Sequence, residues 1–275
     1  MLVPLLLGAV LAASVGSVAR LRRFVVGLLV DWTPLLLALW AYDLARGLGS
    51  HNWFPVHYRM QIDLDRVIGV GSVPTVWLQH HLWHGAAHIQ WYDYASLAVY
   101  VSFFFATPVV LVSLWWFRPA EFRRFAVTLV ALALGACATF LLFPTQPPWL
   151  AAQNHHIPPV AQLIGTLNLH LPLLHLDPLW ERGTGYANVV AAVPSLHAGQ
   201  TLLISLFFWR RLRTPWRHLL WLYPLAMSFA LVYAGEHYVS DILFGFAYCV
   251  VVYFGVERAW GWRRARRLDV ALGPA

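Results

Sequence analysis

The sequence predicts an all-α fold, a polytopic bundle of transmembrane helices. Of its 275 residues, 60% are hydrophobic and 11% are charged, whereas soluble domains carry about 25% charged residues. Apolar segments of roughly 16 to 22 residues recur along the chain, and an α-helix needs about 20 residues to cross a bilayer. Because the sequence has no long polar block, we expect no separate soluble domain.

The chain contains seven candidate membrane spans. They are residues 2–19, 24–45, 95–117, 125–143, 197–210, 218–234 and 239–257. The first resembles a signal peptide, but its arginines follow the apolar run instead of preceding it, which favours a membrane helix. We therefore expect an N-terminal membrane helix (1–23), a main transmembrane domain (24–260) and a basic tail (261–275).

The distribution of arginine predicts the orientation. Fifteen of the 19 basic residues, all arginine, lie in alternate loops and in the C-terminal tail. These loops are residues 20–23, 118–124, 210–217 and 258–267. Arginine-rich loops stay on the cytoplasmic side, so we expect a multi-pass protein of the plasma membrane with a cytoplasmic C-terminus. The net charge of +7 then reflects topology and contact with anionic lipids, not nucleic-acid binding.

The outer segment 46–94 mixes aromatic and charged residues, which is typical of interfacial helices, and it is interrupted near residues 69–74. Within it, His80, His84 and His88 recur every four residues and would share one face of a helix. They could bind a metal, but no cysteine or obvious carboxylate completes the set. We favour an interfacial polar stripe and expect no metal and no cofactor.

His237 and Asp241 are the first candidate catalytic pair. Asp241 lies one turn into an apolar predicted helix, where a carboxylate costs about 2.5–3.5 kcal/mol on insertion scales. His237 precedes it by four residues, so both share one face. A carboxylate that holds Nδ1 of an imidazole aims Nε2 and makes it more basic, which suits a nucleophile. A buried ion pair without a catalytic role is the alternative.

The stretch from Pro194 to His197 (PSLH) is the second candidate element. Proline and serine are common at helix starts, so capping alone could explain them. The free N–H groups of a helix start also bind anions, Ser195 would add a hydroxyl donor, and His197 could donate a proton to a leaving oxygen. About 40 residues separate His197 from His237, enough for two bilayer crossings that return both to the outer face.

Four segments resemble the type 2 phosphatidic acid phosphatase (PAP2) superfamily. Residues 192–198 (AVPSLHA) and 235–245 (GEHYVSDILFG) are similar to its second and third motifs. Residues 74–79 (PTVWLQ) and 143–149 (FPTQPPW) resemble the branch that contains fungal inositol phosphorylceramide synthase. The resemblance covers roughly residues 60–250 and implies a six-helix core, here with one extra N-terminal helix and interfacial helices.

The resemblance also implies a catalytic mechanism without a metal, acting on a membrane lipid. His237 would be the nucleophile that forms a phosphohistidine, Asp241 would orient it, and His197 would be the general acid. Water or an alcohol would then take the phosphoryl group.

Two departures from the superfamily pattern concern phosphate binding. The first motif, K-x6-R-P, has no outer-face counterpart, because Arg118-Pro119 is predicted to be cytoplasmic and Leu111 stands in place of the lysine. Ala230 and Leu231 stand where the third motif begins with Ser-Arg.

Other residues must therefore stabilise the charge on the phosphate oxygens. We expect Arg182, the helix start at Ser195, and Gln146 to do so, and Tyr238 to contact the substrate. The loss of the usual clamp favours a singly charged phosphodiester. The predicted function is therefore transfer of a phospho-head group between lipids. Hydrolysis of a lipid phosphate or polyprenyl diphosphate is the alternative, and a non-enzymatic transporter or structural membrane protein is the second.

Overall fold

The computed structural model describes residues 18–48, 53–169 and 188–272, and its regular structure there is entirely helical. In this part of the chain, two isolated β-bridges join Thr145 to His57 and to Ala191 without forming a sheet. The predicted all-α class is confirmed. The elements are α2 (Val18–Gly27), the π-helix η1 (Leu28–Trp32), α3 (Thr33–Leu48), α4 (Arg59–Ile68), α5 (Pro74–Leu82), α6 (Trp91–Phe117), α7 (Pro119–Leu142), α8 (Pro148–Gln153), α9 (Leu163–Leu169), α11 (Leu196–Trp209), the 3₁₀-helix η4 (Pro215–Trp221), α12 (Leu222–Tyr233) and α13 (Val239–Leu272).

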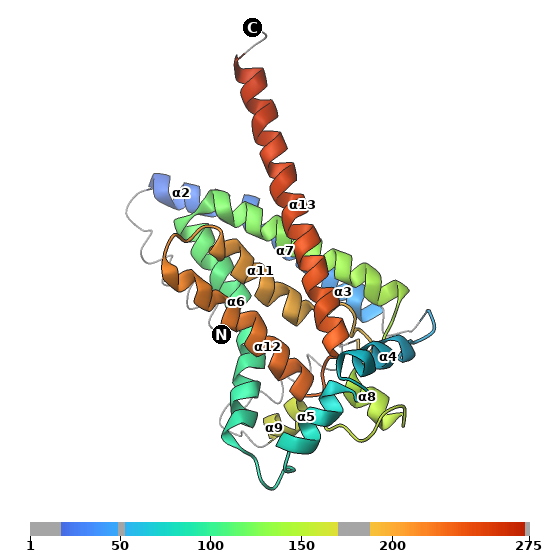
Figure 1. Cartoon of the computed structure of the whole chain (residues 1–275). Coiled ribbons are helices and arrows are strands. Elements are labelled where there is room, and N and C mark those ends of the chain that lie inside the picture. Colours follow the sequence, from blue (N-terminus) through green and yellow to red (C-terminus); the bar gives the residue numbers. More distant parts are fainter. Residues whose placement is uncertain (1–17, 49–52, 170–187, 273–275) are drawn as a thin grey trace.

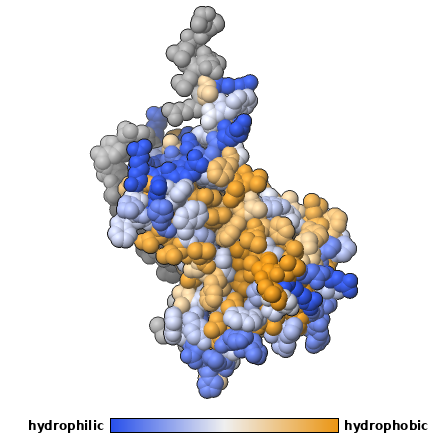
Figure 2. Space-filling model, in the orientation of Figure 1, coloured by the Kyte–Doolittle hydropathy of each residue, from blue (hydrophilic) through white to orange (hydrophobic). Residues whose placement is uncertain are grey.

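Four helical stretches of the described chain are long and apolar enough to cross a membrane. They are Phe24–Gly47, Trp91–Phe117, Pro119–Leu142 and Val239–Arg263. Each contains most of a predicted span, and together they confirm a multi-pass membrane protein. The predicted spans 197–210 and 218–234 are also helical. They form α11 and η4 with α12, which are shorter helices. Figure 2 shows hydrophobic residues gathered in a broad band across the middle of the molecule, with hydrophilic residues toward both ends.

Contacts between the long helices hold the bundle together. Helix α11 packs against α13, α12 and α7, α6 packs against α12 and α7, and α3 packs against α7. Large apolar side chains fill the space between them, among them Phe125, Leu129, Phe207 and Tyr253. The short helices α4, α5, α8 and α9 gather at one end of the bundle, while α13 projects beyond the other (Figure 1).

The N-terminal region differs from the predicted loop between two spans. Residues 1–17, which include most of the predicted span 2–19, lie outside the described residues. From Val18 onward, α2, η1 and α3 follow one another without a break, so the predicted turn at Arg20–Arg23 is helical. No glycine or proline stands there to end the helix.

The interruption near residues 69–74 is confirmed, because α4 ends before Gly69 and α5 begins at Pro74. The expected continuous helix from His80 to His88 is wrong. Helix α5 ends at Leu82, and Gly85 has a φ of 89°, which places it in the left-handed region that favours glycine. His84 and His88 therefore follow the helix and do not continue one of its faces.

Helices α11 and α13 approach each other closely because each carries a glycine at the contact. A Cβ on Gly245 would overlap the backbone of Ser195, and a Cβ on Gly199 would lie 3.1 Å from the carbonyl oxygen of Gly245. The backbone N–H of Ser195 also donates a 3.0 Å hydrogen bond to the carbonyl of Asp241. The two helix starts that carry the predicted catalytic residues are thus joined directly.

Candidate active site

The two histidines separated by two helices lie side by side. The ring centroids of His197, at the start of α11, and His237, just before α13, are 5.8 Å apart with an interplanar angle of 59°. A nucleophile and a general acid on opposite sides of one phosphorus atom require a separation of this order, since reacting atoms approach to about 3–3.5 Å. The structure therefore brings together the pair that the sequence predicted.

Asp241 holds the His237 ring in place. Its Oδ2 lies 3.4 Å from Nδ1 of His237 and accepts a 2.9 Å hydrogen bond from the backbone N–H of Tyr238. The carboxylate is fully buried. Because Nδ1 faces Asp241, Nε2 is the ring nitrogen left to meet a substrate.

Ser195 and the aromatic residues of α6 position His197. Ser195 is the N-cap of α11, where its Oγ accepts a 3.4 Å hydrogen bond from the N–H of Ala198. Tyr100 stacks on the His197 ring at 5.0 Å and Phe103 packs against it at 4.2 Å, centroid to centroid. Nε2 of His197 is buried and has no hydrogen-bond partner within the described chain.

Asp65 is a positioning residue that the sequence argument did not single out. Its two carboxylate oxygens accept 2.9 Å hydrogen bonds from the backbone N–H groups of Val239 and Ser240. It therefore caps the first turn of α13 from a different helix, α4, and braces the backbone that carries His237 and Asp241. Burial raises the pKa of the Asp65 carboxyl, and the hydrogen bonds from α13 oppose this shift.

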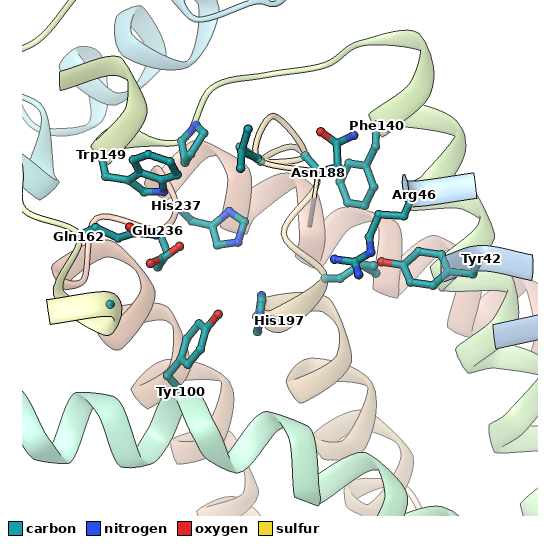
Figure 3. Close-up of a pocket in the computed structure, with 16 residues that line it drawn as sticks. Tyr42, Arg46, Tyr100, Phe140, Trp149, Gln162, Asn188, His197, Glu236 and His237 are labelled. Atoms are coloured by element: carbon teal, nitrogen blue, oxygen red, sulfur yellow. The ribbon is translucent and has the colours of Figure 1, made fainter. Parts of the chain in front are cut away.

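Both histidines line a cavity of about 440 Å³. Arg46 and Tyr42, from the C-terminal half of α3, form one side, and Glu236, Gln162 and Asn188 also line it. Figure 3 shows the Arg46 guanidinium extending toward the two histidines from one side, with the Glu236 carboxylate on the other. The cavity thus holds two imidazoles between a cation and a carboxyl group.

Comparison with known protein families identifies the superfamily of this chain. Residues 62–255, about 70% of the chain, match the pattern of the PAP2 superfamily. The chain belongs to the PAP2 superfamily. Members of this superfamily are generally lipid phosphatases or phosphotransferases, and PAP2 membrane proteins in general act on lipid phosphates.

One curated relative of this PAP2 protein has a more specific name. It is a phosphoinositol dihydroceramide synthase from Bacteroides thetaiotaomicron, 27% identical over 133 residues. The matched region covers 45% of this chain and 42% of the relative, so the chain spans less than half of the relative's length in the match. No solved structure matches the chain significantly.

The other predicted substrate contacts are placed differently in this PAP2 site. Ser195 is fully buried and acts as a cap, and Tyr238 is fully buried in the cluster that contains Ile62. Gln146 precedes Pro147, which lines the cavity, but is not itself a lining residue. Arg182 lies outside the described residues.

Two cavity residues were missed, and each had a sequence signal of a different kind. Arg46 is one of the four arginines outside the arginine-rich loops and tail, and a lone arginine at the end of an apolar helix is a candidate for an anion site. Glu236 was quoted only as part of a motif. Burial raises the pKa of the Glu236 carboxyl to about 7, while His237 and a hydrogen bond with Gln162 oppose the shift.

Within the described residues, no group of three or more histidine, cysteine, aspartate or glutamate side chains is arranged to hold a metal ion. His80 and His81 lie 5.0 Å apart, ring to ring, and Nδ1 of His81 is within 2.8 Å of the Trp77 carbonyl oxygen.

Proposed function

We propose that this protein is an integral membrane lipid phosphotransferase that moves a phosphorylated head group from one lipid to another through a phosphohistidine at His237. The observation that carries the proposal is the convergence of His197, His237 and Asp241 at one cavity. It is supported by membership of the PAP2 superfamily and by the name of the relative from Bacteroides thetaiotaomicron, a synthase.

The first half-reaction transfers the head group to the enzyme. Nε2 of His237 attacks the phosphorus of a phosphodiester lipid, forming a P–N bond as the P–O bond to the lipid alcohol breaks. His197 gives its proton to the departing oxygen, so that the lipid leaves as a neutral alcohol. Asp241 keeps Nδ1 protonated and stabilises the positive charge that develops on the ring.

The second half-reaction reverses these roles. The hydroxyl oxygen of an acceptor lipid attacks the same phosphorus, the P–N bond breaks, and His197 takes the hydroxyl proton. His237 is thereby returned to its starting state. Water in place of the lipid hydroxyl would make the same site a hydrolase.

The charges in the cavity support a phosphodiester as the donor. A diester phosphate carries one negative charge and a monoester close to two. The cavity presents one guanidinium, from Arg46, and places the Glu236 carboxyl on the other side of the histidines. A second substrate charge would face that carboxyl without a matching cation, which is unfavourable in a partly desolvated site.

We also propose that six helices form the membrane core, namely α3, α6, α7, α11, α12 with η4, and α13. Their mutual packing supports this. The arginine-rich loops support a cytoplasmic C-terminus and an outer-face site, since His197 and His237 stand at helix ends opposite to the arginines at 210–217 and 258–267.

Purified protein supplied with a phospholipid labelled in its head-group phosphate tests the proposal. With an alcohol-bearing lipid as acceptor, we expect a new labelled lipid, and without acceptor a labelled protein whose acid-labile phosphate maps to His237. Release of the free phosphorylated head group at the same rate with and without acceptor would instead identify a hydrolase. No labelled product and no labelled protein would overturn the enzymatic assignment.

A further inference from the structure

Among the described residues that line the cavity there is one arginine and no lysine, and the arginine is Arg46 at the end of α3. The K-x6-R-P motif has no counterpart at this end of the bundle, and the third motif lacks its usual Ser-Arg start. We propose that Arg46 is the phosphate-binding cation of this active site and that it holds the non-bridging oxygens of a phosphodiester while His237 attacks. This rests on the proposed function, whose chemistry leaves charge on those oxygens.

The hydrogen bonds of Arg46 leave part of its guanidinium available. Nη2 bonds to Oδ1 of Asp43 at 2.8 Å, whereas Nε is buried and has no acceptor in the described chain. A guanidinium presents its five N–H donors as a planar fork, so engagement of one edge by Asp43 leaves the others for a ligand. In Figure 3 the group points from α3 toward the histidines.

The ion pair with Asp43 does not account for where Arg46 lies. The Asp43 side chain is 61% exposed and that of Arg46 is 27% exposed. Exposed pairs three residues apart contribute little to stability, on the order of 0.5 kcal/mol. A pair serving only the surface would not need the arginine to line a cavity shared with two histidines.

A second, independent observation comes from Asn188. This residue is 7% exposed, and its Oδ1 accepts a hydrogen bond from the N–H of Val190, which leaves the Nδ2 amide as the free end. Asn188 lines the same cavity as Arg46, and its Nδ2 is buried without a partner in the described chain, as is Nε2 of His197. Buried donors normally have acceptors.

These donors select the chemical class of the ligand. Nitrogen donors from three elements border one cavity, and a tetrahedral anion with several acceptor oxygens can satisfy them together. Glu236 on the other side disfavours a second negative charge in the ligand. The geometry therefore fits the phosphate of a diester, with Arg46 and Asn188 on its non-bridging oxygens and His197 on the leaving oxygen.

The test compares Arg46→Gln and Arg46→Lys with two matched controls. Arg66→Gln removes another arginine that pairs with an aspartate three residues away, Asp63, at 3.7 Å. Asp43→Asn breaks the Arg46 ion pair but keeps the guanidinium. Two quantities are measured on detergent-solubilised full-length protein: kcat/KM for head-group transfer, and the rise in Tm caused by orthovanadate, an inorganic phosphate analogue.

We expect Arg46→Gln to lower kcat/KM by about 100-fold or more and to abolish the vanadate-induced rise in Tm. Arg46→Lys should retain the rise and lose about 10-fold in kcat/KM, because an ammonium keeps the charge without the fork. Both controls should behave like the wild type. If Arg46→Gln does not fold, Arg46→Lys decides alone. A kcat/KM equal to that of the wild type would overturn the proposal, and an about 10-fold lower kcat/KM would support it.

The remaining outcomes separate this proposal from the proposed function. Wild-type kcat/KM and vanadate response in Arg46→Gln would overturn the role of Arg46 while transfer by the wild type still stood. Equal losses in Arg46→Gln and Asp43→Asn would assign Arg46 a structural ion pair and also overturn it. Arg46-dependent vanadate binding by a protein that transfers no head group would support the anion site and refute lipid transfer.

Discussion

Both ends of the helix bundle carry clusters of polar side chains, but the two clusters differ in how their nitrogen atoms are hydrogen-bonded. At the end where α11 and α13 begin, His197, Arg46 and Asn188 line a cavity, and each has a buried nitrogen atom without a hydrogen-bond partner in the described chain. At the other end of α7, α11 and α13, Arg211 is hydrogen-bonded on all three of its nitrogen atoms.

Arg211 is the centre of this second cluster. Nε bonds to Glu121 at 2.6 Å, Nη2 to Glu257 at 3.1 Å, and Nη1 to the Phe207 carbonyl oxygen at 3.0 Å. The guanidinium also lies 3.6 Å from the centre of the Phe207 ring. The Arg211 cluster, defined as Arg211 with Glu121 and Glu257, thus ties three helices together.

In this fold, a structural polar cluster differs from a functional one in where its hydrogen bonds go. Buried charges that bond fully to each other stabilise a packing arrangement. Buried donors that converge on a cavity without bonding to each other are arranged for something that comes from outside.

His237→Ala should reduce head-group transfer by about 1,000-fold or more, because it removes the proposed nucleophile. Asp241→Asn should reduce it by about 10- to 100-fold, since the amide can still accept from Tyr238 but no longer stabilises the charged ring. Initial rates and the yield of phosphohistidine check both. Measurable phosphohistidine in a folded His237→Ala protein would place the nucleophile elsewhere.

Asp65→Asn should lower kcat by about 10- to 100-fold, as expected when an indirect support of a catalytic group is lost. It should also cost about 1 kcal/mol of stability, because one of two capping oxygens becomes an N–H₂ donor. The matched control is Asp63→Asn on the same helix, whose side chain is 70% exposed. Unequal kcat with comparable KM is the expected pattern, and equal rates in the two variants would contradict it.

Arg211→Gln should do the reverse and destabilise the fold without affecting the chemistry. Removing this cation takes away the short hydrogen bonds to Glu121 and Glu257 and leaves them only Arg124, at 3.9 and 3.6 Å, a loss of about 1–3 kcal/mol in a half-buried site. Thermal unfolding measures this, and kcat per folded molecule should stay at the wild-type value. Arg213→Gln in the same loop, where the side chain is exposed, is the control. A lower kcat for Arg211→Gln would mean that the two ends are coupled.

Glu236→Gln should change how stability depends on pH. The folded-state pKa of about 7 lies above the ordinary value of 4.5, so the folded protein binds more protons than the unfolded chain in that window. Wild-type stability therefore falls as pH rises from about 4.5 to 7, on the order of 3 kcal/mol in full. The Tm of the variant minus that of the wild type should grow from pH 5 to pH 8. A difference independent of pH would show that Glu236 titrates normally.

Much of the fold was predictable because the signals are local. Apolar length identifies a span without knowledge of its neighbours, and the predicted spans within the described residues are all helical. The four-residue spacing of His237 and Asp241 places them together by helix geometry alone. The two-span spacing that returns His197 to His237 is nearly as local, since it counts crossings of a bilayer of fixed thickness.

Arg46 and Asp65 could not be found in this way because packing brings them to the site. Asp65 bonds to Val239 across 174 positions in the sequence, and no periodicity in either segment specifies that contact. The expected helix through His88 was wrong for a related reason, since spacing indicates a shared face only if the backbone stays helical. Periodicity predicts relations within one element, and contacts between elements need coordinates.

Gly245 has a consequence for how such a site can change. A methyl group there would collide with the main chain of Ser195. The distance between the two imidazoles is therefore set by direct contact between the backbones of two helices. Variation at this helix crossing would alter the reaction itself. Redesign toward other lipids would therefore have to change residues of the cavity wall, such as Trp149, Gln162 and Val189, and keep Gly245.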